Sequence, residues 1–254
     1  MDLSKNFKNN GFSLVKNPFK SELIVPWVKE FDRIIIQLKK SGENLNARWG
    51  SDLTKDLESN NSEIIHTHNV QSFSALMLSL VQNKELINLV ECLIGPNIIL
   101  HHTKLFLKPP KTGAAFPLHQ DWSYFPTEKN SMIAAVVHLS ESTEEMGCLR
   151  IIPESHKLGK KKNTDGHKVN PEIHNKYSLI KAEPIVADLG DVVFFHSCVL
   201  HGSMPNISNK SRKTILLQFY SGKDKILKMT GHTNVQLVLR GVNYFATRNN
   251  VSNI

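Results

Sequence analysis

Apolar side chains recur at helical spacing near the start of the chain. Within residues 21–40 the apolar positions include Leu23, Trp27, Phe31, Ile34, Ile35 and Leu38. This period places them on one face of a helix, and Ser41-Gly42 supplies a stop signal directly afterwards. We therefore predict an amphipathic helix over 21–40. Residues 1–20 are polar with scattered aromatic side chains and give no such pattern.

A second helical region is predicted over residues 72–94. Its apolar positions include Leu76, Leu80, Leu86, Leu89, Val90 and Leu93. Ser72 or Ser74 can cap its start, and Gly95-Pro96 ends the pattern. A break near Gln82-Asn83 makes a pair of helices an alternative to a single one. The polar stretch 43–69 is expected to be rich in loops.

After residue 97 the pattern changes to short apolar runs separated by Gly and Pro. The runs cover residues 98–107, 133–139, 148–152, 192–195 and 214–220. Short strands with such punctuation are typical of a sandwich or jelly roll. We predict one mainly β domain over 1–254 with N-terminal helices (α+β). It would contain a helical part over about 20–95 and a cupin-like double-stranded β-helix core over about 97–222.

The stretch 154–184 interrupts the predicted core. It is rich in Lys, Asn, Gly and His, and a loop of this length in a compact domain is usually functional or mobile. We therefore predict a lid over the mouth of the barrel.

Several features bear on the compartment. No apolar run is long enough to predict a transmembrane helix, and the N-terminus lacks the apolar core of a signal peptide. The C-terminal Ser252-Asn253-Ile254 is not a Ser-Lys-Leu address. Cys92, Cys148 and Cys198 form no Cys-x-x-Cys motif, and such a sparse set suits a reducing compartment. We expect a cytoplasmic protein, with an N-terminal organelle address left open.

The formal net charge of +8 lies largely in loops, at Lys157, Lys160-Lys161-Lys162, Lys210, Arg212 and Lys213. A solvated basic surface explains it most simply. The functional alternatives are an anionic substrate, such as a coenzyme A thioester or a phosphate, and nucleic acid. We do not expect nucleic acid, because no basic stripe with interleaved aromatic residues accompanies the charge.

The chemistry of the chain is indicated by His119-Gln120-Asp121, followed later by His201 and Arg212. On a strand, His119 and Asp121 would point to one face, and His201 follows the apolar run 192–195 at a strand end. Two histidines and one carboxylate can hold Fe(II) and leave open positions for a co-substrate and oxygen. The Arg212 guanidinium can bind the carboxylate of an acidic co-substrate. This set predicts a non-heme iron oxygenase that uses 2-oxoglutarate.

The remaining histidines are interpreted as bystanders: His66, His68, His101, His102, His138, His156, His167, His174, His196 and His232. His196 is the most credible alternative ligand, because it lies five residues before His201. Trp122 and Tyr124 can line a substrate pocket or pack the barrel wall. Lys104 and Lys108 can face either solvent or the pocket.

Three segments resemble the phytanoyl-CoA dioxygenase family, and together they span roughly residues 95–221. They are Lys108-Pro109-Pro110 with Pro117-Leu118-His119-Gln120-Asp121-Trp122-Ser123-Tyr124-Phe125-Pro126; Gly147-Cys148-Leu149-Arg150-Ile151-Ile152-Pro153-Glu154-Ser155-His156-Lys157; and Gly190-Asp191-Val192-Val193-Phe194-Phe195-His196 with His201-Gly202-Ser203 and Arg212-Lys213. The order and spacing of the segments are specific for this family and much less specific for a substrate.

The resemblance implies Fe(II) held by His119, Asp121 and His201, with ascorbate as an accessory reductant. It implies hydroxylation coupled to decarboxylation of 2-oxoglutarate to succinate. Related halogenases carry a small residue where Asp121 stands, so the carboxylate favours hydroxylation over halogenation.

The resemblance also assigns the co-substrate. Arg212 would pair with the distal carboxylate of 2-oxoglutarate, because a planar guanidinium matches a carboxylate in bidentate fashion. Ser203 would donate a hydrogen bond to the same carboxylate, and Gln120 would lie near the co-substrate.

Two departures from the family pattern concern the pocket. Members that act on phytanoyl-CoA carry a lysine where Asn69 or His68 stands, and a tryptophan where Val137 stands. We expect a hydroxylase of a small organic molecule or acyl thioester. The alternative is a catalytically silent member that acts as a binding or regulatory protein. Substrate identity and oligomeric state stay open.

Overall fold

The computed structural model describes residues 2–227 and 233–246. Its helices are α1 (Leu3–Asn10), α2 (Ser21–Lys40), α3 (Ala75–Val81), α4 (Lys84–Ile94) and α5 (Pro171–His174), with short 3₁₀ turns η1 (Lys55–Leu57), η2 (Val70–Ser72), η3 (Asp121–Ser123) and η4 (Ser155–Leu158). His232 and the C-terminal tripeptide, which were considered above, lie outside the described residues.

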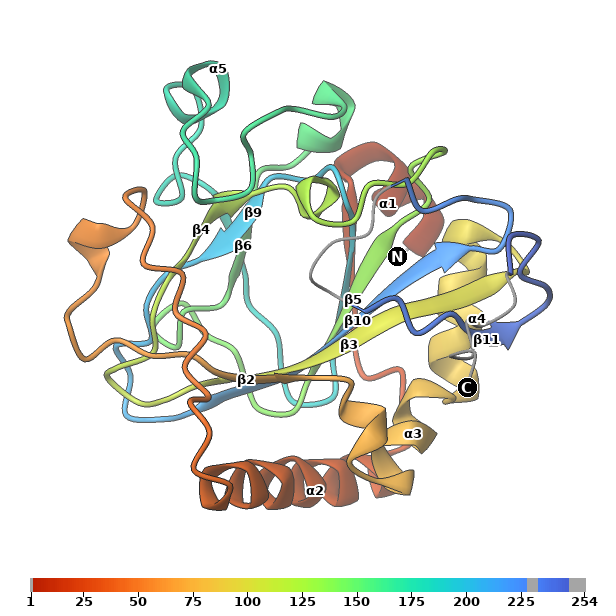
Figure 1. The fold of residues 1–254 in the computed structure, drawn as a ribbon, viewed down its shortest axis with the longest axis horizontal. Helices are drawn as coiled ribbons and strands as arrows, with labels where there is room; N and C mark the ends of the chain where they lie inside the picture. Colours follow the sequence, from red (N-terminus) through yellow and green to blue (C-terminus); the bar gives the residue numbers. More distant parts are fainter. Residues whose placement is uncertain (1, 228–232, 247–254) are drawn as a thin grey trace, which may run out of the picture.

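The strands form a larger and a smaller antiparallel sheet (Figure 1). The larger sheet has the order β1 (Phe12–Val15), β8 (Val192–His196), β5 (Ile133–His138), β10 (Arg212–Ser221), β3 (Ile98–Lys108) and β11 (Leu237–Arg240), and β2 (Ile65–His68) also pairs with β3. The smaller sheet has the order β4 (Phe116–His119), β9 (His201–Ser203), β6 (Leu149–Ile151) and β7 (Glu183–Ile185).

One face of the larger sheet is covered by helices (Figure 1). Helix α2 spans the predicted residues and buries Trp27, Phe31 and Ile34 against sheet side chains such as Leu105 and Leu217. This apolar stripe stabilises α2 through packing more than through intrinsic propensity. Between the two sheets lies a second cluster, which includes Val136, Ile151, Val193, Phe195 and Val199.

The second helical region is the predicted pair. The Ser74 hydroxyl accepts a hydrogen bond from Met77 N at 3.0 Å, and the Asn83 side chain accepts one from Leu86 N at 3.1 Å. Each cap satisfies an orphan N–H group at the start of a helix. The chain therefore starts a new helix after Gln82 and does not continue the first one.

The five apolar runs after residue 97 form β3, β5, β6, β8 and β10. The predicted jelly-roll class is confirmed, although the two sheets do not close into a barrel. The prediction of loops over 43–69 missed β2, because its sequence Ile65-His66-Thr67-His68 lacks an apolar alternation. The short elements α1 and β1 were also missed. Helix α1 buries no side chain, so no apolar stripe marks it.

Among the described residues, no helix is long and apolar enough to span a membrane. The insert 154–184 contains η4 and α5 and projects beyond the smaller sheet at the top of Figure 1.

Candidate metal centre and cavity

The predicted metal ligands converge where the smaller sheet meets η3. His119 is the last residue of β4 and His201 is the first residue of β9, and these two residues are direct partners in the antiparallel register. Asp121 begins η3. The expectation that 119–121 is one strand was therefore wrong, because the strand ends at His119. His201 also starts its own strand and does not end β8.

The three side chains are buried and mutually close. Asp121 Oδ1 lies 3.6 Å from Nε2 of His119 and 3.6 Å from Nε2 of His201. One ligand atom from each residue lies within 4.8 Å of the others. Within residues 2–227 and 233–246 this is the one group of three or more such side chains that could hold a metal ion.

Backbone carbonyls orient both imidazoles toward this point. His119 Nδ1 lies 2.8 Å from Pro117 O, and His201 Nδ1 lies 3.0 Å from Val199 O. A carbonyl can only accept, so each Nδ1 carries the proton and each Nε2 presents a lone pair toward Asp121. This is the arrangement found for metal-binding histidines. The two-histidine, one-carboxylate donor set therefore fits Fe(II).

The pKa values of Asp121 and His201 favour the protonation states that bind a cation. Burial alone would raise the pKa of Asp121, but the neighbouring His201 and His119 rings lower this pKa below its usual range. Burial, helped by His119, lowers the pKa of His201 to about 4. At neutral pH the centre thus holds a carboxylate and a neutral His201, as metal binding requires.

The metal centre opens into a cavity of about 370 Å³. Its walls include the three ligand residues and further polar side chains, namely His66, His68, Lys104, His138, Ser203, Arg212, Thr214 and Gln218. Its apolar walls include Trp49, Phe106, Phe116, Phe125 and Val136. The predicted Arg212 and Ser203 thus share one cavity with the metal centre.

Arg212 has donor capacity left for a ligand. It begins β10, it is buried, and one of its terminal nitrogens donates to Gly147 O. Its Nε has no partner among the described residues, and the same is true of His138 Nδ1 on the adjacent strand. Burial lowers the pKa of Arg212 to about 10, so the guanidinium stays charged at neutral pH. An acidic ligand would satisfy this charge.

Lys108 supports Ser203 from behind. It is fully buried, and its Nζ donates to Ser203 Oγ at 2.7 Å and to Met204 O at 2.6 Å. Because the Ser203 oxygen accepts from Lys108, its hydroxyl proton is available for a ligand in the cavity. Lys108 itself faces neither solvent nor the cavity, whereas Lys104 lines the cavity.

Gln120 does not lie in the cavity. Its amide nitrogen donates to Gly159 O at 3.0 Å and to Cys198 O at 2.7 Å. Its amide oxygen accepts from Lys161 N at 3.1 Å and from Thr164 Oγ1 at 3.2 Å. The expectation that Gln120 lies near the co-substrate is therefore corrected, because these contacts engage its amide outside the cavity. The side chain faces away from the metal and fastens the insert to the core.

The two departures from the family pattern have different positions. The Val137 side chain packs in the core beneath the helices, while its neighbours Val136 and His138 line the cavity. Successive side chains of a strand face opposite sides, so the expectation that Val137 lies beside the pocket was wrong. Of the other pair, His68 lines the cavity.

The positions of His196, the alternative metal ligand, and of Trp122 and Tyr124 are also clear. His196 Nδ1 accepts from Cys198 N at 3.0 Å, and the ring borders a separate cavity with Phe7. Tyr124 lines the main cavity, and Trp122 is not among its walls.

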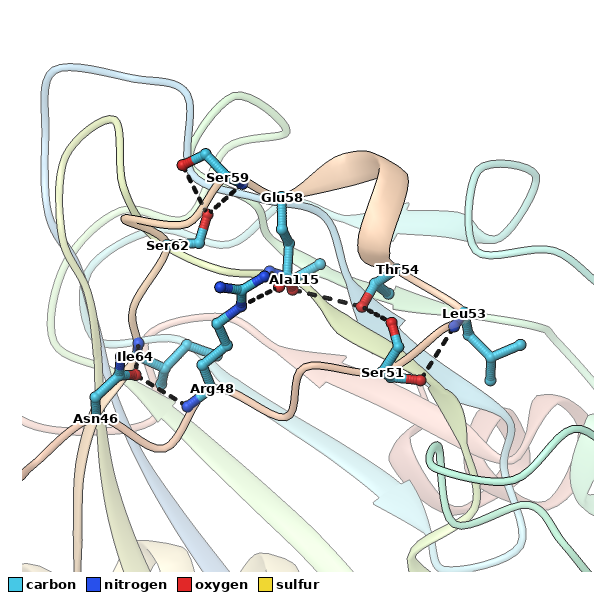
Figure 2. Close-up of polar contacts among 10 residues, drawn as sticks. All are labelled: Asn46, Arg48, Ser51, Leu53, Thr54, Glu58, Ser59, Ser62, Ile64 and Ala115. Atoms are coloured by element: carbon cyan, nitrogen blue, oxygen red, sulfur yellow. Dashed lines mark hydrogen bonds and ion pairs between the residues drawn. The ribbon is translucent and has the colours of Figure 1, made fainter.

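Sequence reasoning missed the wall that contains Trp49. Figure 2 shows the polar contacts that hold this segment. The Glu58 carboxylate accepts from Arg48, from Thr54 Oγ1 at 3.4 Å and from Ala115 N at 3.1 Å. The last contact ties the segment to the chain just before β4. No motif marked Trp49, because its position depends on contacts distant in sequence.

Trp49 also meets the insert. Its ring stacks on His167 with a centroid separation of 5.1 Å, and it lies 4.7 Å from the His119 ring. Two further contacts fasten the same loop, from the Tyr124 hydroxyl to Asp165 O and from Ser51 Oγ to Gly166 O. The insert thus lies against the cavity, and His167 forms part of its wall.

Comparison with known proteins places these features in one family. The family model for phytanoyl-CoA dioxygenase (PhyH) matches residues 7–214. The peroxisomal phytanoyl-CoA dioxygenase of Homo sapiens is 31% identical over 99% of this chain and 78% of its own length. A probable alpha-ketoglutarate-dependent hypophosphite dioxygenase of Stutzerimonas stutzeri is 30% identical over 56% of this chain and 51% of its own length.

Solved structures agree on the fold. The alpha-ketoglutarate-dependent epimerase SnoN superimposes with a TM-score of 0.73 at 19% identity, over 90% of this chain and 85% of that one. EctD from S. alaskensis superimposes with a TM-score of 0.71 at 18% identity, over 93% and 85% of the two chains. The predicted resemblance is therefore confirmed: this chain belongs to the phytanoyl-CoA dioxygenase family of Fe(II)- and 2-oxoglutarate-dependent oxygenases.

Proposed function

We propose that this protein hydroxylates a small organic substrate, using Fe(II), O₂ and 2-oxoglutarate and releasing succinate and carbon dioxide. One observation carries the proposal: the His119–Asp121–His201 cluster opens into the same cavity as the buried cation Arg212. A metal centre and a carboxylate-binding group in one cavity match the two ends of 2-oxoglutarate.

In this proposal His119, Asp121 and His201 hold Fe(II). The metal supplies oxygen activation coupled to decarboxylation of the oxo acid. The protein contributes ligand orientation through the Pro117 and Val199 carbonyls. Among residues 2–227 and 233–246, three such side chains converge at this point, which would leave coordination positions for the co-substrate and oxygen.

Arg212 and Ser203 hold the distal carboxylate of 2-oxoglutarate in this proposal. The free Nε of Arg212 and the hydroxyl proton of Ser203 supply charge-assisted hydrogen bonds in a water-poor setting. The insert and Trp49 shield the other side of the cavity, which limits access of water to the reaction.

Anaerobic titration with Fe(II) and 2-oxoglutarate tests the assignment. The wild type should develop the weak visible absorption of the iron–oxo-acid chelate. His201→Ala should lose it, and Arg212→Ala should need far more 2-oxoglutarate to reach it. Lys39→Met, an exposed change on α2, is the control. A folded, iron-loaded wild type that develops no absorption would favour the alternative, a catalytically silent binding protein.

Two departures from the family pattern motivated the silent alternative, one at Asn69 or His68 and one at Val137. The second no longer supports it, because Val137 packs in the core and does not line the cavity. Two lysines of the insert form ion pairs with nearby carboxylates. Lys157 pairs with Glu154, and Lys161 pairs with Glu172 at 2.7 Å. These contacts favour a solvated surface over a clamp for coenzyme A phosphates. We also propose a reducing compartment such as the cytoplasm, because all three cysteines are free thiols.

A further inference from the structure

The cavity contains a second cation that the proposed function leaves unused. Lys104 lies in the middle of β3 and lines the same cavity as Asp121 and Arg212. We infer that Lys104 binds an anionic group, a carboxylate or a phosphonate, of the primary substrate. This inference rests on the proposed function and adds a substrate class to it: small acids with an apolar body.

The carboxylate that acts on Lys104 through space is Asp121, which raises the pKa of Lys104 but is itself assigned to the metal. Its Nζ lies 5.5 Å from the centre of the Phe125 ring and 6.0 Å from that of Phe106. Across the described ranges 2–227 and 233–246, no carboxylate or carbonyl accepts a hydrogen bond from Nζ. Cation–π contacts stabilise such a charge only modestly. An ammonium group on the wall of this cavity therefore favours an incoming anion.

The other charges of the site balance without Lys104. Fe(II) and Arg212 together offset Asp121 and the dianion 2-oxoglutarate. Lys108 is already engaged with Ser203 and Met204, and burial lowers its pKa well below the ordinary value. Burial lowers the pKa of Lys104 to about 8, so it remains mostly protonated at pH 7. One positive charge is thus left for the substrate.

Two histidines of β2 complete a polar patch beside Lys104. His68 pairs with Lys104 in the strand register, and the His66 ring stacks on Phe106 with an interplanar angle of 16°. Burial lowers the pKa of both imidazoles to about 4, so they are neutral at pH 7. Both rings are therefore polar without adding charge, which leaves Lys104 as the one charged group of this patch.

The rest of the cavity suits an apolar body. Trp49, Phe116, Tyr124 and Phe125 form aromatic walls around the metal centre. The volume of about 370 Å³ is at the small end for ligand pockets and must also hold 2-oxoglutarate. A small aromatic or aliphatic acid fits this space beside the co-substrate.

Calorimetry with matched probes tests the inference. The protein is loaded anaerobically with Fe(II) and saturating 2-oxoglutarate, which occupies Arg212. It is then titrated with 3-phenylpropionate, hexanoate and phenylphosphonate, and with the neutral amides of the two carboxylic acids. The proteins are the wild type, Lys104→Met, Lys104→Arg and the exposed control Lys39→Met.

We expect the wild type and Lys39→Met to bind at least one acid about tenfold more tightly than its amide, or to bind phenylphosphonate where the amides do not bind. Lys104→Met should lose this preference, and Lys104→Arg should keep most of it. A wild type without preference, or Lys104→Met with the preference intact, overturns the inference.

The visible absorption of the iron–2-oxoglutarate chelate separates this inference from the proposed function. In Lys104→Met the dissociation constant of 2-oxoglutarate should stay within about twofold of the wild type, because Lys104 acts on the substrate. A rise of about tenfold would assign Lys104 to the co-substrate and overturn the inference. Loss of the chelate in the wild type would instead contradict the proposed function, whatever the acid preference.

Discussion

Gln218 Nε2 lies 2.6 Å from Asp121 Oδ2, while the other carboxylate oxygen, Oδ1, faces the two metal-centre histidines. Gln218 is buried on β10 and belongs to the larger sheet, whereas Asp121 begins η3 beside the smaller sheet. One hydrogen bond therefore connects the two sheets at the metal centre and fixes which oxygen Asp121 can offer to an ion.

Gln218→Leu should weaken Fe(II) binding by about 10- to 100-fold, the range seen when an outer hydrogen bond to a metal ligand is removed. The reason is that Asp121 would lose the hydrogen bond that fixes the orientation of its carboxylate. Anaerobic Fe(II) titration measures this change, with the exposed Gln37→Leu as the matched control. An unchanged Fe(II) affinity would show that packing alone orients Asp121.

Lys108 and Ser203 should act as one unit on the co-substrate. Ser203→Ala and Lys108→Met should each weaken 2-oxoglutarate binding by about tenfold, because Lys108 acts by holding the Ser203 oxygen. The double variant should be no worse than the poorer single variant. Titration of the chelate absorption measures all three variants. Additive losses would mean that Lys108 contacts the co-substrate independently.

Removal of the Gln120 amide should loosen the insert. Gln120→Leu leaves Gly159 O, Cys198 O and Lys161 N without this buried partner, which costs about 1–3 kcal/mol of unfolding free energy per unsatisfied group. Urea unfolding measures the loss. Trypsin should also cut near Lys160–162 sooner in this variant than in the wild type. Unchanged cleavage would place the anchor of the insert elsewhere.

Folding stability should fall in mild acid. Burial lowers the pKa of His138 to about 4, from an ordinary value of about 6.5. Between these values the unfolded chain binds a proton that the folded chain does not, so the free energy of unfolding rises with pH across this window. His196, whose pKa burial also lowers to about 4, acts in the same direction.

Urea unfolding at pH 7 and pH 5 checks this dependence. His138→Gln should reduce the slope by up to about 1.4 kcal/mol per pH unit, because Gln does not titrate. A wild-type stability that is flat from pH 7 to pH 5 would contradict the lowered pKa values.

Local patterns predicted a large share of this protein. The 3.6-residue period gave the residues of α2, and cap residues gave the break between α3 and α4. The ligand types and their order indicated the metal chemistry although the assumed strand geometry was wrong. These signals are local, since each depends on side chains a few residues apart.

The walls of the cavity were decided by tertiary structure. Val136 and His138 face the cavity and Val137 does not, and a register shift of one residue would reverse this. Lys104 meets His68 only because β2 pairs with β3, and Gln120 faces the insert only because the chain turns into η3 after β4. The sequence by itself thus determined the elements and the chemistry of the metal ligands, because short-range periodicity and residue type encode them. Which other side chains meet the substrate was decided by strand pairing and packing between segments distant in sequence, and no local pattern records these contacts.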